Sequence, residues 1–349
     1  TPLLLTSVCA MWRDIAIDIP SLWSSLLIQD SASWYLYTDL VVQWLDRSKA
    51  RPLSIRTSAD DGFAHRANHL KFATLFEIIR RYADRWRLIN VRTTTELFKM
   101  FLGHCYINSP RLESLIFHIV DSAFERDVDI ITLKSPQLKT LYMSSACLAT
   151  VILDWNHLTA VQLKAASIDE ILEVLRRAPG LLRCDLARIY DDDAVYALPA
   201  TLFHPSLLSL TLYPEEGVEQ VVCKALERLT LPHLQRLTYN FKHTSPFNMV
   251  IALPFLVRSG REITYLSLEQ IEFRCISPIS IITILEHLPS LTELRMECRK
   301  NDTNLTELFF HRLALAPTSW TPNFLPHLQI LNYCGMRCEP HRVRCSDVT

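Results

Sequence analysis

Apolar residues recur along this chain in one short phrase in which hydrophobic and polar positions alternate. The phrase is Pro-x-Leu-x-x-Leu-x-apolar, and its clearest copy spans residues 110–117. Full copies also begin at Pro136, Pro205, Pro232, Pro289 and Pro326. Weaker copies start at Trp86, Leu158, Leu181 and Ile263. The alternation predicts one short strand per copy, with its apolar side chains on a buried face.

The distance between copies indicates how the strands are connected. Successive copies begin mostly 20 to 29 residues apart, a period typical of proteins built from stacked repeats. Apolar residues at helical spacing predict helices between several strands, over residues 168–177, 218–229 and 279–288. We therefore predict an α/β fold, an irregular solenoid of about ten strand–helix repeats. The last interval is longer, which predicts an insertion or long loop between residues 301 and 320.

A different apolar pattern precedes the repeats. Residues 4–16 follow the 3–4 spacing of one amphipathic helix, which Pro20 ends, and Leu22 and Trp23 then form a short apolar anchor. Downstream, the pattern predicts a helix over 33–48, a strand over 52–56, a helix over 70–82 and a strand over 86–91.

The N-terminal segment resembles the C-terminal half of an F-box. The matching residues are Val8, Cys9, Trp12, Ile15, Pro20, Leu22 and Trp23. The resemblance is closest to F-box-like proteins of mushroom-forming (basidiomycete-type) fungi, which carry leucine-rich repeats. The family's first helix, with its Leu-Pro-x-Glu-Ile opening, has no counterpart here, so we expect an N-terminally incomplete F-box. A plain helix that caps the repeats is the other interpretation of this segment.

The resemblance implies three regions and a function. They are an F-box-like segment (residues 1–30), connecting helices with a short strand (31–77) and a leucine-rich-repeat solenoid (78–349). The family role would be that of a substrate-recognition subunit of an SCF-type (cullin-RING) ubiquitin ligase. The F-box would dock on a Skp-type adaptor and the repeats would recruit an unknown protein substrate for degradation. The alternative is a leucine-rich-repeat binding scaffold without a ubiquitin ligase.

Composition and charge narrow the classes of partner. The net charge is −1 and no long run of one sign occurs, so the sequence predicts neither a nucleic-acid partner nor a membrane partner. The ten cysteines are scattered, and those at apolar positions, such as Cys9 and Cys184, are typical of reduced buried thiols. We therefore expect a cytoplasmic or nuclear protein that is monomeric outside its complex.

The sequence contains no recognisable catalytic or cofactor-binding motif. It lacks glycine-rich phosphate loops, a Gly-x-Ser-x-Gly elbow and a His-Glu-x-x-His helix, so we expect a protein that is not an enzyme and has no cofactor. Residues 191–193 are three aspartates, and a solvated turn explains them without a metal. Cys334, Cys338, His341 and Cys345 leave two possibilities open, a zinc site or a frayed basic tail.

Polar positions that alternate with the buried leucines predict a partner-binding concave face. A face that carries both signs of charge together with tyrosines suits a protein surface better than a uniformly charged polymer. Each of these residues taken alone is also compatible with a merely solvated strand position. The candidates are Arg92, His118, Tyr142, Lys164, Arg183, Arg236, Tyr213, Tyr265, Glu269, Glu293, Arg295 and Glu297.

Overall fold

The structure is a computed structural model of the chain. It describes residues 2–29, 38–58, 69–93, 101, 106–119, 131–144, 148, 151–190, 196–197, 200–215, 217–241, 253–271, 278–298, 307–314, 324–334 and 341–344. The chain divides into two compact units, Thr1–Ala160 and Val161–Thr349, which we call the N-terminal unit and the C-terminal unit.

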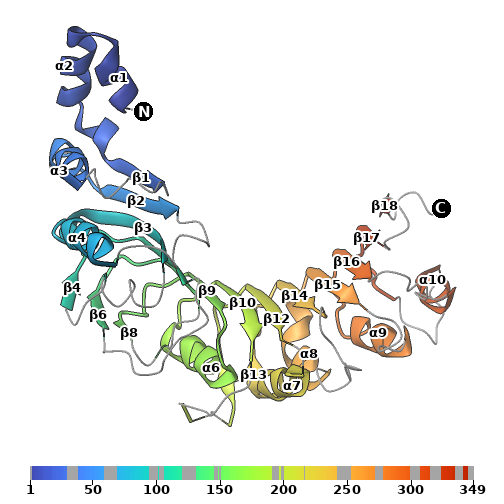
Figure 1. Ribbon diagram of the computed structural model, residues 1–349. Helices are drawn as coiled ribbons and strands as arrows, with labels where there is room; N and C mark the ends of the chain where they lie inside the picture. The colour runs from blue at the N-terminus through green and yellow to red at the C-terminus, as the bar shows by residue number, and fades with distance from the viewer. Residues whose placement is uncertain are drawn as a thin grey trace. The chain divides into compact units, whose positions relative to one another are not determined.

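The N-terminal unit contains a parallel sheet preceded and flanked by helices (Figure 1). The helices and 3-10 turns are α1 (Pro2–Val8), α2 (Ala10–Asp18), η1 (Pro20–Trp23), α3 (Thr38–Arg47), α4 (His69–Arg80) and η3 (Ala83–Arg85). The strands pair in the order β1 (Ser25–Gln29), β2 (Leu53–Ser58), β3 (Trp86–Thr93), β5 (Ser114–Ile119) and β7 (Thr140–Ser144). A smaller parallel sheet contains β4 (Tyr106–Asn108), β6 (Ile131–Lys134) and β8 (Val151–Leu153). Strand β9 (Ala160–Lys164) contains the boundary between the units.

The C-terminal unit is a second run of parallel strands. They pair in the order β10 (Arg183–Ile189), β12 (Ser209–Pro214), β14 (Arg236–Asn240), β15 (Tyr265–Ile271), β16 (Glu293–Cys298) and β17 (Ile330–Cys334). Strand β18 (His341–Arg344) joins β17 antiparallel, and β11 (Leu202–Phe203) pairs with β13 (Leu229–Thr230). The helices are α6 (Ile168–Arg177), α7 (Glu219–Arg228), α8 (Leu253–Ser259), η6 (Gly260–Glu262), α9 (Pro278–Leu285) and α10 (Glu307–Ala314).

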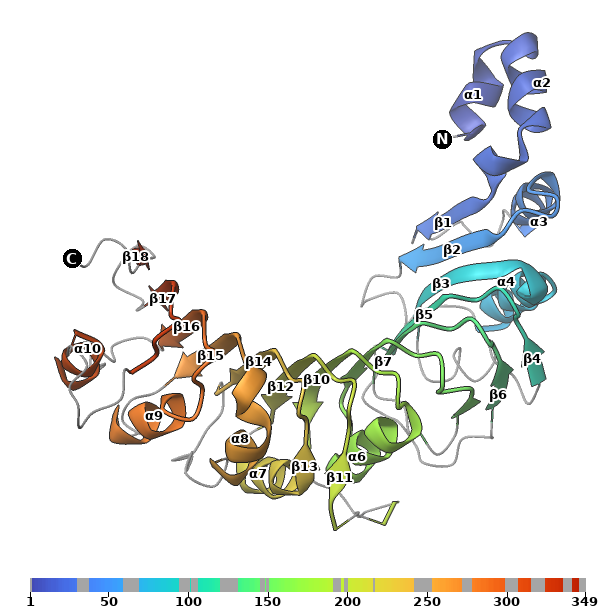
Figure 2. The ribbon, with the colours of Figure 1, turned by 180° about the vertical axis from the view of Figure 1, so that it is seen from behind.

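Helices cover one face of the C-terminal strands and leave the other face open. Figures 1 and 2 both show α6, α7, α8 and α9 on the same side of the strands. This arrangement follows from strand geometry, because successive side chains point to opposite faces and only one face carries apolar residues throughout. In register, Leu210, Leu237, Leu266, Leu294 and Leu331 form one buried row across five strands. The open face is therefore the place where polar side chains gather.

Helix α6 illustrates why the connecting segments become helical. Ser167 and Glu170 form a capping box at its N-terminus, and Arg176 and Arg177 occupy its last turn, where cations favour the helix dipole. Its buried residues include Ile171, which faces the core with its apolar neighbours. The predicted helix over residues 168–177 is confirmed to the residue.

The α/β class is confirmed, and so are the predicted strand positions at β2, β3, β5, β7, β9, β10, β12, β14, β15, β16 and β17, but one local prediction among the repeats was wrong. Between β5 and β9 the described residues contain the short strands β6 and β8 where a helix was expected in each repeat. These segments pair with one another, and hydrogen bonds between neighbouring repeats replace the bonds within a helix. The long last interval, predicted as an insertion or long loop, contains α10, which is compatible with an insertion.

Candidate functional site

Glu269 is the centre of a polar network on the open strand face of the C-terminal unit. Its carboxylate lies 3.2 Å from the Asn240 amide nitrogen and 3.4 Å from the hydroxyls of both Tyr213 and Ser267. The three groups come from β12, β14 and β15, which place them side by side because Asn240 is opposite Glu269 in register. The donors to Glu269 from Tyr213, Asn240 and Ser267 are all neutral groups.

The environment of Tyr213 keeps its phenol protonated. Burial raises the pKa of Tyr213, and the negative charges of Glu269 and Asp185 raise it further. The hydroxyl therefore remains a donor toward Glu269 across the physiological pH range.

The other charged residues on this face are arranged in local pairs. The Arg183 Nε atom lies 2.7 Å from Asp185, and the Arg236 guanidinium stacks 3.8 Å from the centre of the Tyr265 ring. Further along, Arg295 lies 3.6 Å from Glu297. The Asn332 amide is 3.4 Å from Glu293. The predicted residues of β10 to β16 are thus brought onto one face, with acidic groups prevailing toward β16.

Two strands on this face carry bulges that the sequence did not reveal. Arg188 and Gln270 have φ values of 54° and 58°, in the left-handed region that side chains other than glycine rarely adopt. The pairing register shifts at both places, as in β-bulges, which re-aim side chains. Arg188 thereby lies 2.9 Å from Glu215 and Gln270 donates to Glu297 at 2.7 Å.

The N-terminal unit has its own cluster of predicted residues. Arg92 and His118 are opposite each other on β3 and β5, and the His118 ring lies 4.3 Å from that of Tyr142 on β7. Burial raises the pKa of Tyr142, whereas the nearby positive charge of Arg92 lowers it. Lys164, on the part of β9 that belongs to the C-terminal unit, is exposed. Sequence alternation placed all four on the polar side of their strands, but only the structure shows that three of them are neighbours.

The F-box-like residues separate into a buried anchor and an exposed surface. Trp23 is fully buried, donates from its indole nitrogen to the Ala16 carbonyl at 2.7 Å and packs edge-on against Trp44 at 5.0 Å. Pro20 and Leu22 are half-buried. In contrast, Val8, Trp12 and Ile15 are exposed, with 46 % of Trp12 accessible.

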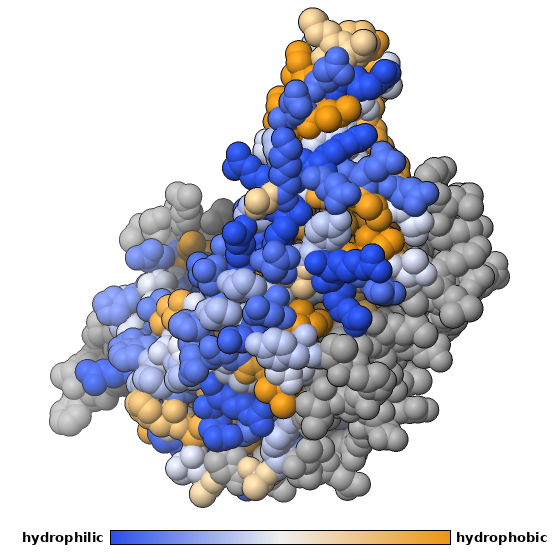
Figure 3. All heavy atoms as spheres, turned by 90° about the vertical axis from the view of Figure 1, so that its left-hand side faces the viewer, coloured by the Kyte–Doolittle hydropathy of each residue, from blue (hydrophilic) through white to orange (hydrophobic). Residues whose placement is uncertain are grey.

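The prediction of a single amphipathic helix over this segment was wrong. Cys9 adopts an extended conformation (φ −160°, ψ 172°) and divides the segment into α1 and α2, which pack against each other. Of the two helices' described residues, only Ala16 is buried. Cys9 itself is exposed, contrary to the expectation of a buried thiol. Figure 3 shows hydrophobic residues at the surface in the region of α1 and α2. Within residues 2–19, the exposed large apolar residues are Leu3, Leu4, Val8, Met11, Trp12, Ile15 and Ile19.

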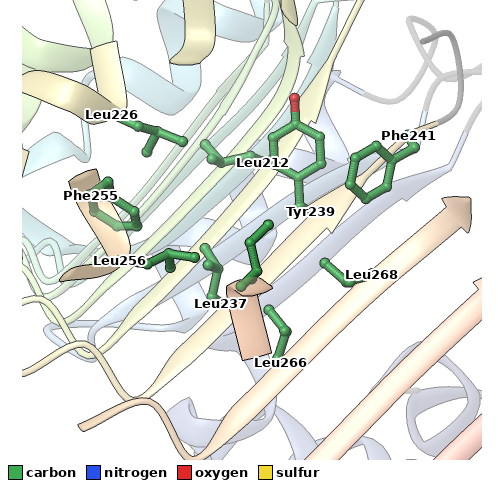
Figure 4. A pocket seen from close by; sticks show the side chains of 10 residues that line it. Leu212, Leu226, Leu237, Tyr239, Phe241, Phe255, Leu256, Leu266 and Leu268 are labelled. Atoms are coloured by element: carbon green, nitrogen blue, oxygen red, sulfur yellow. The ribbon is translucent and has the colours of Figure 1, made fainter. Parts of the chain in front are cut away.

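A small apolar cavity lies inside the C-terminal unit (Figure 4). Its volume is about 40 Å³ and it lies between strands β12, β14 and β15 and helices α7, α8 and α9. Phe255 and Leu256 of α8 face Leu237 and Leu266 of the strands across it. A cavity of this size with apolar walls is a packing defect between repeats and offers no polar group to orient a ligand.

The described residues include only part of the predicted metal and thiol sites. Among them, no group of three or more His, Cys, Asp or Glu side chains is placed to hold a metal ion. The aspartates at 191–193, Cys338 and Cys345 lie outside the described residues, so the zinc alternative stays open. Cys184 is buried, as predicted, and burial raises the pKa of its thiol far above the ordinary value. That thiol is therefore protonated and unreactive.

His204 is buried beneath the C-terminal end of α6. We predict that it lowers the free energy of unfolding in acid. Its Nε2 atom donates to the Ala178 carbonyl at 2.9 Å, and burial lowers its pKa. The folded state therefore binds this proton less readily than the unfolded chain, whose histidine pKa is about 6.5. The contribution of His204 to the free energy of unfolding is full above about pH 6.5. Below that pH it declines, by at most about 2 kcal/mol at pH 5.

Thermal denaturation between pH 7 and pH 5 would measure this effect. His204→Gln, which can donate the same hydrogen bond but does not titrate, should lose less stability in acid than the native protein. His327→Gln, at an exposed position, serves as the matched control and should retain the native decline. If His204→Gln and the native protein lost equal stability in acid, His204 would not be the cause of the acid-dependent loss.

Comparison with known proteins identifies no family for this chain. No family model matches the chain, and no curated protein matches it significantly. Within the part of the chain that the structure describes, no helix is both long and apolar enough to cross a membrane.

Proposed function

We propose that this chain is a protein-interaction subunit in which α1 and α2 dock on an adaptor protein and the strand faces bind a second protein. The observation that carries the proposal is the exposed apolar surface on α1 and α2. Five large apolar side chains that are each nearly half accessible or more lie on two short helices: Leu4, Val8, Met11, Trp12 and Ile15. Several large apolar side chains exposed close together are typical of a contact site for another protein.

The surface is built like a docking site and not like a loosely packed end of the fold. Trp23 attaches the segment to the sheet through a buried hydrogen bond and the contact with Trp44, so the helices are anchored while their apolar side chains stay exposed. An exposed tryptophan beside aliphatic residues is a typical hot spot of a helix-mediated interface. Arg13 and Asp14 provide exposed polar groups beside it.

The repeats supply the second half of the proposal. We infer a leucine-rich-repeat solenoid, supported by the recurring phrase and by the parallel, in-register pairing of the strands that it predicted. Open strand faces rich in Tyr, Arg and Glu are suited to recognising a protein surface.

Together with the F-box resemblance, these features favour a substrate-recognition subunit of a cullin-RING ubiquitin ligase. The exposed helices would bind a Skp-type adaptor and the repeats would hold the substrate, while the chain itself performs no chemistry. The alternative, a repeat scaffold without a ligase, shares the strand faces but requires no adaptor.

Capture of a purified Skp-type adaptor by the chain, together with any residues encoded upstream of it, tests the proposal. We expect binding, and we expect the double variant Trp12→Ser/Ile15→Ser to weaken it by about a thousandfold, because two hot-spot residues of about 2 kcal/mol each contribute about 4 kcal/mol together. Val257→Ser changes an exposed apolar residue of α8 and should leave capture unchanged.

The outcome separates the two candidates. If neither form of the chain captures the adaptor, the ligase role is wrong and the scaffold interpretation is favoured. If the double variant binds as well as the native chain, the surface on α1 and α2 is not the docking site.

A further inference from the structure

The outward strand positions of the N-terminal unit carry cations but no acid. On β2, β3, β5 and β7 they are Ser54, Arg56, Leu88, Asn90, Arg92, Ser114, Ile116, His118, Thr140 and Tyr142. The corresponding positions of the C-terminal unit include Asp185, Glu269, Glu293 and Glu297. The two units therefore present open faces of different chemistry.

The register places the functional side chains of this face in two adjoining rows. Arg56, Asn90, Ile116 and Tyr142 lie opposite one another on four neighbouring strands. Two residues further along the strands, Arg92 lies opposite His118. Opposed residues on neighbouring strands are about 5 Å apart, so one extended segment could contact both rows. We call these six residues the basic strand face.

Contacts within the basic strand face hold its donors in place. The His118 and Tyr142 rings are 4.3 Å apart, and the charge of Arg92 is close enough to lower the pKa of the Tyr142 phenol. The backbone nitrogen of Arg92 donates to the Thr57 hydroxyl at 3.0 Å, which ties β3 to β2 beside Arg56. Guanidinium, imidazole, phenol and amide groups are the donors that proteins use to bind carboxylates.

The same face offers an apolar contact. Ile116 is half-buried between Asn90 and Tyr142, so its exposed part can receive an aliphatic side chain. Arg56 is exposed and forms no ion pair with any described residue. Glu113, which is exposed, precedes β5 and lies outside the two rows.

We propose that the basic strand face binds an extended acidic segment of a partner protein, with a carboxylate held by Arg56, Arg92 and His118 and an apolar side chain resting on Ile116. The inference rests on the proposed protein-interaction role, because it names the chemistry of the partner. It does not depend on the adaptor. The apolar contact and the small number of cations favour a peptide over a nucleic acid, whose binding depends on many phosphate contacts.

Fluorescence anisotropy with the full chain tests the proposal. The probe is a labelled twelve-residue peptide that repeats Ser-Leu-Ser-Asp, and matched peptides carry Asn or Lys in place of Asp. We expect the acidic peptide to bind at least about tenfold more tightly than the Asn peptide, and less tightly as salt increases.

Variants locate the site. Arg56→Glu should lower the affinity for the acidic peptide by about tenfold or more, because it replaces an attraction with a repulsion at an exposed position. Arg261→Glu, at an exposed position in η6 of the other unit and away from the strand faces, should leave the affinity unchanged. Equal binding of the acidic and Asn peptides, no effect of Arg56→Glu, or tighter binding of a twelve-base single-stranded DNA would each overturn the proposal.

Adaptor capture measured on Arg56→Glu distinguishes this inference from the proposed ligase role. Capture should be unchanged, since the variant does not alter α1 or α2. If the native chain binds the acidic peptide but not the adaptor, the ligase role fails and the basic strand face stands. If the native chain captures the adaptor but shows no preference for acidic peptides, the ligase role stands and the basic strand face is not an acidic-peptide site.

Discussion

Replacing Trp23 with alanine is expected to lower the free energy of unfolding by about 3–5 kcal/mol, the usual cost of truncating a large buried aromatic residue. The side chain is fully buried, and its indole nitrogen donates to the Ala16 carbonyl. The variant also removes the ring beneath the Arg47 guanidinium, 4.6 Å from its centre, and the contact with Trp44. Urea denaturation followed by circular dichroism measures the loss.

Trp12 provides a matched control for this prediction, since it is also a tryptophan of the N-terminal segment. Because nearly half of Trp12 is exposed, Trp12→Ala should change the free energy of unfolding by less than about 1 kcal/mol. Trp23→Phe, which retains an aromatic ring, should lie between the two alanine variants. Similar losses for Trp12→Ala and Trp23→Ala would contradict the division of this segment into an anchor and an exposed surface.

Replacing Phe255 with alanine should destabilise the C-terminal unit by a comparable amount, about 3–5 kcal/mol. Phe255 is 1 % exposed and lines the cavity of about 40 Å³ beneath α8. Its removal would enlarge a space that the surrounding repeats already fail to fill, so little of the lost contact could be recovered by collapse. The free energy of unfolding, again from urea denaturation, is the quantity to compare.

Val257 lies two residues away on the same helix and is 62 % exposed. Val257→Ala should therefore change stability by less than about 0.5 kcal/mol. If Phe255→Ala cost no more than this control, the packing of α8 against β14 and β15 would be wrong. Both variants place alanine on the same helix. A larger loss of the free energy of unfolding for Phe255→Ala would therefore be due to the burial of its ring.

The candidate sites could be predicted only in part, and the N-terminal segment shows why. The sequence grouped Val8, Trp12 and Trp23 as one motif, since their spacing and residue types match a family pattern. The structure separates them, because the chain breaks at Cys9 and only Trp23 reaches the sheet. Helical periodicity identifies an apolar face, but whether another element covers that face is decided by distant parts of the chain.

The open strand faces show a similar limit. Period-two alternation placed Arg92, Tyr213 and Glu269 on the polar side of their strands. It could not show that Glu269 accepts from Tyr213 or that the His118 ring contacts that of Tyr142, because such neighbours depend on the register between strands. The left-handed residues Arg188 and Gln270 gave no signal at all, since neither is a glycine.

By itself the sequence determined where the strands of the recurring phrase lie, which side of each is buried, and where helix α6 begins and ends. These properties follow from local periodicity and capping, which act within a few residues. The tertiary structure alone decided that small parallel strands replace helices between β5 and β9 and that α1 and α2 expose their apolar side chains. It also decided that Arg56, Arg92, His118 and Tyr142 share one acid-free face. The strand pairings behind these outcomes join residues about 20 or more positions apart, which no local pattern specifies.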